Sequence, residues 1–268
     1  MLTCYDIRLL LPHGIFIDNS LSLEERSVNV KCHDLQEKES CVRWRKKPDI
    51  FEGRGRKMVS NYEKQVDIGR QYFLKYDPEK LAAKFHLSID ESYLYIRYLD
   101  TDYRIDRKTA AVEGKKAEEY EECREYTIVM TIYDMLCHGT EQEIPALTGD
   151  WKLIGNFAAA GSSPDANLFA QKYADAFNGK VQELKAACET MGGRIQNRLA
   201  GADVTAQIPA FPFFPVLFQF WEGDDEFTPQ IRILWDSQTM KFLNFETTYY
   251  LQGDLLDRLA ELMDVIRL

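Results

Sequence analysis

The chain has 268 residues, enough for one large domain or two small ones, and it carries 33 basic against 43 acidic side chains. Because affinity for nucleic acid rests mainly on Lys and Arg contacts to phosphate, this balance disfavours nucleic acid and anionic membranes as partners. No apolar run approaches the roughly 20 residues that span a bilayer, and the six cysteines form no C-x-x-C pair. Such cysteine usage is typical of reduced thiols and predicts a soluble cytoplasmic protein.

The beginning of the chain differs from the rest. Residues 1–57 hold 11 Lys or Arg against 9 Asp or Glu and show no sustained apolar period. The run Phe51–Met58 is rich in Gly, Glu, Arg and Lys, as a translated purine-rich ribosome-binding site would be. We therefore expect 1–57 to be a basic leader, either disordered or upstream DNA read as protein with Met58 as the true start. Residues 58–268 are expected to form a single domain.

From residue 61 onward the apolar spacing becomes regular and predicts several helices. Asp77-Pro78 supplies an N-cap and a first-turn proline for one short helix, and Ser163-Pro164-Asp165 supplies the same signals for a later one. Gly139 and Gly179 are expected to end helices as left-handed caps. The expected helices span about 61–76, 78–85, 118–136, 163–179, 181–191 and 251–266.

The strands are expected mainly in the second half of the chain, after an early hairpin over 93–105. The run 216–221 is nearly continuously apolar, which predicts a central strand buried on both faces. Further strands are expected over 204–208, 231–236 and 241–245. Because helices and strands are grouped rather than alternating, the sequence predicts a single-domain α+β fold in which an antiparallel sheet packs with helices.

The segment between two of these strands is the most informative part of the chain. The run Trp221-Glu222-Gly223-Asp224-Asp225-Glu226-Phe227-Thr228-Pro229 predicts an acidic turn. Its acids can be solvated charges at a hairpin tip, or oxygen ligands for Ca²⁺ or Mg²⁺, although the spacing matches no calcium loop. Because Gly223 allows a tight turn and Phe227 and Pro229 add rigid apolar surface, the loop suits binding. The candidate binding residues here are Trp221, Glu222, Asp224, Asp225, Glu226 and Phe227.

Trp151 is a further candidate binding residue. Trp151 and Trp221 can each be half-buried core residues, or both can line a cleft beside the acidic run. In the second case we expect the acids to gather near Trp151 at the rim of a concave surface, with Phe211, Phe213 and Phe214 nearby. The proline-rich run 209–215 is then either a wall of that pocket or a rigid lead into the central strand.

Common catalytic motifs are missing from the sequence. It contains no G-x-x-x-x-G-K-[ST], G-x-G-x-x-G, H-E-x-x-H or G-x-S-x-G pattern. Cys137 and His138 are adjacent, but neighbouring helical residues point about 100° apart. We therefore interpret them as a buried core cysteine and a helix-end cation. The sequence assigns no catalytic residue, no metal-ligand set and no cofactor.

Several motifs together resemble a prokaryotic family of unknown function, known mainly from anaerobic bacteria and archaea. The resemblance rests on Tyr62-Glu63-Lys64, Asp77-Pro78-Glu79, the hairpin over 93–105, Leu147-Thr148-Gly149-Asp150-Trp151, and a W-E-G-D-x-E-F-x-P motif at 221–229. It covers nearly all of 58–268 and none of 1–57, which favours Met58 as the start. Some relatives are fused to iron–sulfur modules, so the resemblance implies that any redox role would come from a partner such as an iron–sulfur protein.

Two classes of function fit these observations. The first is a non-catalytic small-molecule-binding or accessory protein that recognises its ligand or protein partner through the Trp221–Pro229 loop. The alternative is an enzyme in which Glu222, Asp224 or Glu226 performs acid/base chemistry, since a carboxylate between aromatic rings can have a raised pKa.

Overall fold

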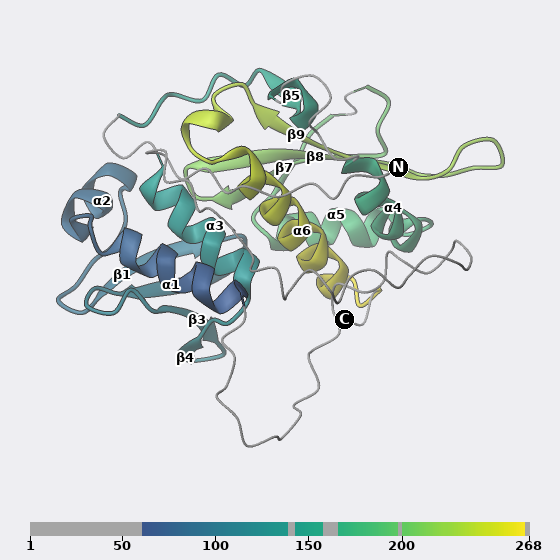
Figure 1. Cartoon of the computed structure of the whole chain (residues 1–268). Coiled ribbons are helices and arrows are strands. Elements are labelled where there is room, and N and C mark those ends of the chain that lie inside the picture. The colour runs from purple at the N-terminus through teal and green to yellow at the C-terminus, as the bar shows by residue number, and fades with distance from the viewer. Residues whose placement is uncertain (1–60, 139–142, 158–165, 198–199, 266–268) are drawn as a thin grey trace, which may run out of the picture. The chain divides into compact units, whose positions relative to one another are not determined.

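The computed structural model describes residues 61–138, 143–157, 166–197 and 200–265, and it shows helices and strands in an α+β arrangement (Figure 1). The predicted fold class is confirmed, with two antiparallel sheets in place of one. The helices are α1 (Asn61–Phe73), α2 (Pro78–Phe85), α3 (Tyr126–Cys137), α4 (Ala166–Phe177), α5 (Val181–Thr190) and α6 (Phe245–Leu262), with short 3-10 helices η3 (Ile154–Phe157) and η4 (Thr239–Lys241).

The strands form a four-stranded first sheet and a five-stranded second sheet. The first sheet is a meander in the order β1–β2–β3–β4, and the second has the order β5–β9–β8–β7–β6. Their bounds are β1 (Tyr93–Tyr98), β2 (Thr101–Asp106), β3 (Val112–Lys116), β4 (Glu119–Glu122), β5 (Trp151–Leu153), β6 (Arg194–Ile195), β7 (Val204–Phe211), β8 (Phe214–Trp221) and β9 (Gln230–Asp236).

The prediction of a helix over 118–136 is wrong for the first third of that range. Residues 119–122 form β4, which pairs with β3, and α3 begins only at Tyr126. The segment carries good helix formers, but residues 119–122 pair along β3, and Gly114 of β3 lets the Tyr103 ring of β2 pack closely, 3.0 Å from where a Cβ would stand. Cross-strand pairing therefore overrides local helix propensity here.

The second sheet confirms the predicted central strand. β8 lies between β7 and β9, and its side chains are buried on both faces. Phe218 and Phe220 lie opposite Ile233 and Ile231 of β9, so these apolar side chains share one face as expected. On that face Phe220 meets Phe177 of α4 edge-on, with ring centroids 6.4 Å apart.

The prediction of a strand over 241–245 is also wrong. Its first residue belongs to η4, and Phe245 is already the first residue of α6. The reason is a long-range contact, because Asp134 of α3 accepts hydrogen bonds from the backbone N–H and the side-chain amide of Asn244. A carboxylate at this position satisfies the free N-terminal end of α6 and favours helix over strand.

Two other predicted helix ends are confirmed. Asp77 caps α2 by accepting from the backbone N–H of Glu79, with Pro78 as the first helical residue, as expected. Gly179 has φ +76°, the left-handed conformation predicted for it. The leader 1–57, the Gly139 cap, the Ser163-Pro164-Asp165 start and Ile266 lie outside the described residues. In the described part of the chain, no helix combines the length and the apolar character needed to cross a membrane.

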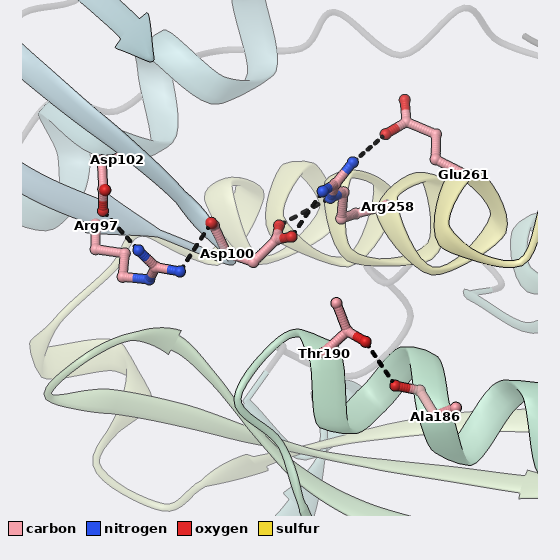
Figure 2. Close-up of polar contacts among 7 residues, drawn as sticks. All are labelled: Arg97, Asp100, Asp102, Ala186, Thr190, Arg258 and Glu261. Atoms are coloured by element: carbon pink, nitrogen blue, oxygen red, sulfur yellow. Dashed lines mark hydrogen bonds and ion pairs between the residues drawn. The ribbon is translucent and has the colours of Figure 1, made fainter. Parts of the chain in front are cut away.

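The two sheets meet where β1 ends and β7 ends. The backbone N–H of Leu99 donates to the carbonyl of Ala210 at 2.7 Å, and the rings of Tyr98 and Phe211 pack with centroids 4.9 Å apart. The turn after β1 is also tied to α6, because Arg258 forms a two-pronged ion pair with Asp100 at 2.8 and 2.7 Å (Figure 2).

Replacing Phe218 by Ala should lower the free energy of unfolding by about 3–5 kcal/mol, because it removes a fully buried ring from the central strand and leaves a cavity. Urea denaturation followed by circular dichroism measures the change. The exposed Glu183→Ala variant on α5 is the control and should stay within about 0.5 kcal/mol of the parent. A Phe218→Ala protein as stable as the control would contradict the central position of β8.

Replacing Asp100 by Asn should cost about 1–3 kcal/mol, because the Asp100 side chain is only 9% exposed and its loss leaves the Arg258 guanidinium without its main partner. Asp102→Asn is the matched control. Its pair with Arg97 is almost half exposed on both sides, so its loss should cost less than about 1 kcal/mol. Equal destabilisation of the two variants would show that the Asp100 pair does not brace the fold.

Candidate functional site

The predicted acidic run is the connection between β8 and β9, which we call the acidic loop (Trp221–Pro229). Figure 1 shows this connection extending beyond the body of the second sheet. The side chains of its four acids are exposed to solvent, and Phe227 is 65% exposed. Trp221 is half-buried at the start of the loop, and Pro229 is buried at its end. The loop therefore presents one large apolar ring among carboxylates.

The acidic loop has a defined turn. A Cβ on Gly223 would stand 2.6 Å from Cδ of Pro229, so only glycine allows the two ends of the loop to approach this closely. At the tip, Asp224 Oδ1 accepts hydrogen bonds from the backbone N–H groups of Glu226 and Phe227 at 2.9 and 2.8 Å. These two bonds stabilise the carboxylate and lower the pKa of Asp224.

The base of the acidic loop is anchored to the turn between α4 and α5. The backbone N–H of Gly179 donates to Glu222 Oε1 at 3.0 Å, and the N–H of Gly223 donates to Asn178 Oδ1 at 2.9 Å. On the other side, the N–H of Glu222 donates to Asp203 Oδ2 at 2.9 Å. Sequence reasoning used Gly179 only as a helix end and missed Asn178 and Asp203, because their partners in the loop lie 45 and 19 positions away in the sequence.

Trp221 is held at the same base. Its indole N–H donates to the carbonyl of Ala200 at 3.3 Å, and the Arg232 guanidinium lies 4.8 Å from its ring centroid. The ring is therefore both hydrogen-bonded and stacked, which fits the half-buried interpretation of this tryptophan.

The expected gathering of the acids near Trp151 is not found. Trp151 pairs with Asp236 at one end of β9, whereas Trp221 pairs with Gln230 at the other end. Gln230 and Asp236 are six residue steps apart along the strand, which is a distance of about 20 Å. Trp151 is half-buried in the edge strand β5, so it shares no surface with the acidic loop.

The aromatic wall expected around that cleft belongs to the core. Phe211 and Phe214 are fully buried and face each other at the β7–β8 turn, the end of β8 opposite Trp221. Phe213 packs against Phe85 of α2 with ring centroids 4.9 Å apart. The proline-rich run 209–215 therefore forms the hairpin that leads into the central strand, the second of the two interpretations.

The Thr148-Gly149-Asp150-Trp151 motif surrounds a buried carboxylate. Asp236 has no exposed surface, and it accepts hydrogen bonds from the backbone N–H groups of Thr148 and Gly149 at 2.9 and 2.7 Å. It also accepts from the N–H of Gln238 at 2.9 Å. These contacts fix β5 against the end of β9, which gives the motif a structural role.

The described residues contain no group of three or more His, Cys, Asp or Glu side chains that could hold a metal ion. Cys137 is buried, and burial raises the pKa of its thiol. His138 caps the end of α3, and its Nε2 lies 3.0 Å from the carbonyl oxygen of Met240. Cys137 thus has the core role expected from the sequence, and His138 lies at the helix end as expected.

Residues 77–258, about two thirds of the chain, match the family described as Domain of unknown function (DUF3786). The chain belongs to this family. The DUF3786 match includes the Asp77-Pro78 helix start, the Thr-Gly-Asp-Trp motif and the acidic loop, and it begins after α1. No curated protein and no solved structure matches the chain significantly.

Replacing Asp236 by Ala should lower the free energy of unfolding by about 2–3 kcal/mol, because three backbone donors lose a charged acceptor. Asp225→Ala on the acidic loop removes the same group from an exposed position and should cost less than about 0.5 kcal/mol. Thermal and urea unfolding measure both. If the two variants are equally stable, the motif around Asp236 has no structural role.

Proposed function

We propose that the protein is a non-catalytic accessory protein and that its acidic loop binds a protein partner. The observation that carries this proposal is Phe227, a ring that is 65% exposed at the tip of a loop whose base is anchored by hydrogen bonds. A large exposed ring costs solvation free energy in the unbound protein, and aromatic side chains are enriched at the energetic centres of interfaces.

The chemistry of the loop defines the partner. Phe227 shares the loop with the exposed acids Glu222, Asp224, Asp225 and Glu226, so the complementary surface is an apolar pocket with a basic rim. Because the loop is held by Gly223 and by Asn178, little conformational entropy is lost when it docks. The exposed position of all four acids favours a protein surface over an enclosed small molecule.

The catalytic alternative receives less support from the loop. Proton transfer near neutral pH requires a carboxylate with a raised pKa, whereas backbone hydrogen bonds from Glu226 and Phe227 lower the pKa of Asp224. Trp221 and Phe227 do not enclose the acids, since Phe227 itself points into solvent. The loop is thus better suited to constant negative charge than to acid/base chemistry.

The partner class can be narrowed further by composition and by family. The net charge of −10 disfavours nucleic acid, because phosphates would be repelled. The fusion of some relatives to iron–sulfur modules makes a separate iron–sulfur protein one partner to test. Within this proposal the protein acts in the cytoplasm and supplies a recognition surface while the partner supplies any redox chemistry.

The proposal is tested by placing a photo-crosslinking amino acid at position 227 and, as the matched control, at Leu153, which is 48% exposed on β5. Irradiation in cells of the native host should give a discrete crosslinked complex from position 227 and none from position 153. Asp224→Asn with Glu226→Gln should remove that complex without changing the melting temperature, because an Asn side chain can still accept the turn hydrogen bonds.

Binding is then measured with the purified partner. We expect Phe227→Ala to weaken affinity by at least about tenfold, the effect of losing an interface anchor. Crosslinking of equal strength from both positions, or a complex that survives the double amide change, would contradict the proposal.

A further inference from the structure

Three tyrosines from three helices form two linked ring pairs, with Tyr126 in the middle. Tyr62 of α1 and Tyr126 of α3 have ring centroids 5.0 Å apart with an angle of 58° between their planes. Tyr126 and Tyr250 of α6 lie 5.7 Å apart at 76°. Because the planes are steeply inclined, the rings form the walls of a corner instead of a flat stack. Figure 1 shows α3 between α1 and α6, and α3 contacts both of these helices.

A carboxylate lies beside these rings. Glu246, in the first turn of α6, is half-buried and lies one helical turn before Tyr250 on the same face of the helix. Among the residues that the structure describes, the Glu246 carboxylate has no hydrogen-bond or ion-pair partner. Its pKa is raised by burial and then by the nearby Asp134. This half-buried carboxylate thus has a second acid as its charged neighbour and no counter-ion from the described chain.

The second acid does not need a cation. Asp134 accepts hydrogen bonds from the backbone and the side chain of Asn244 at the start of α6, so its charge is already stabilised. Glu246 has no such arrangement. The dipole of α6 stabilises the charge of Glu246 to some extent, because Glu246 lies near the helix N-terminus. The dipole does not explain why three tyrosine rings lie nearby.

Ring faces and a carboxylate attract the same class of ligand. The faces of tyrosine rings carry partial negative charge and attract cations, and aromatic cages of this composition bind ammonium groups. Tyr62 is 53% exposed, so the corner is accessible from solvent. Tyr126 is held in place, since its hydroxyl donates to Gln65 Oε1 of α1.

From this geometry we infer that Tyr62, Tyr126, Tyr250 and Glu246 form a binding site for an organic ammonium cation. We call it the tyrosine–carboxylate site. The rings contact the alkyl or methyl groups of the ligand, and Glu246 supplies the counter-charge. The ligand is either a free amine or the ammonium group of a lysine side chain. The site lies on α1, α3 and α6 and is independent of the acidic loop.

The test uses choline and its neutral isostere, in which a carbon atom replaces the ammonium nitrogen. Both probes have the same shape, so only the charge differs. Isothermal titration calorimetry of the full chain should show choline binding at least about tenfold more tightly than the isostere. A short lysine-containing peptide is titrated in parallel, and whichever ammonium binds more tightly identifies the source of the natural ligand.

Variants test whether choline binds at the tyrosine–carboxylate site. Glu246→Gln and Tyr62→Ala should each weaken choline binding at least about tenfold, and because Tyr62 is largely exposed its loss should leave the melting temperature unchanged. Glu226→Gln removes an equal charge from the acidic loop and should have no effect.

The inference is overturned by any of three results. These are no binding of choline or of the peptide at millimolar concentration, equal binding of choline and its isostere, and choline binding that is unchanged in both Glu246→Gln and Tyr62→Ala.

Discussion

Two-sided pairing of β8 is the constraint on which most of the described fold depends. β8 pairs with β7 along one edge and with β9 along the other, and its side chains are buried on both faces. A shift of one residue would turn every large ring on β8 to the wrong face. The register of β8 therefore determines where the β7–β8 turn meets the first sheet, where β5 can add to β9, and where the acidic loop leaves the sheet.

Around this strand, buried acids hold the periphery together. Asp236 fixes β5 to the end of β9, Asp134 fixes the start of α6, and Asp100 ties the first sheet to Arg258 of α6. Each carboxylate has the donors that a buried charge requires. A part of the acidic composition is thus structural, and the net charge alone does not distinguish these acids from those that face solvent on the acidic loop.

The two proposed sites have opposite designs. On the acidic loop, one apolar ring is surrounded by solvated carboxylates, an arrangement suited to a broad protein surface. At the tyrosine–carboxylate site, one half-buried carboxylate lies near three aromatic rings, an arrangement suited to an organic cation. Because the two sites use different helices and strands, a change at Phe227 and a change at Glu246 should affect different ligands. If both proposals hold, this separation allows the protein partner and the ammonium group to bind independently.

The sequence by itself determined those features that arise from neighbouring residues. The continuous apolar run 216–221 identified the central strand, Asp77-Pro78 identified a helix start, and the Gly223–Pro229 spacing identified a tight acidic turn. Only the tertiary structure decided features that join distant segments. Residues 119–122 became a strand through pairing with β3, and Trp151 was placed about 20 Å from Trp221 by its pairing with the far end of β9. The tyrosine–carboxylate site could not be predicted from the sequence either, since its residues lie up to 188 positions apart. Local patterns report on backbone preference and on the burial of one face, whereas the partners of a strand edge or a ring depend on how the whole chain packs.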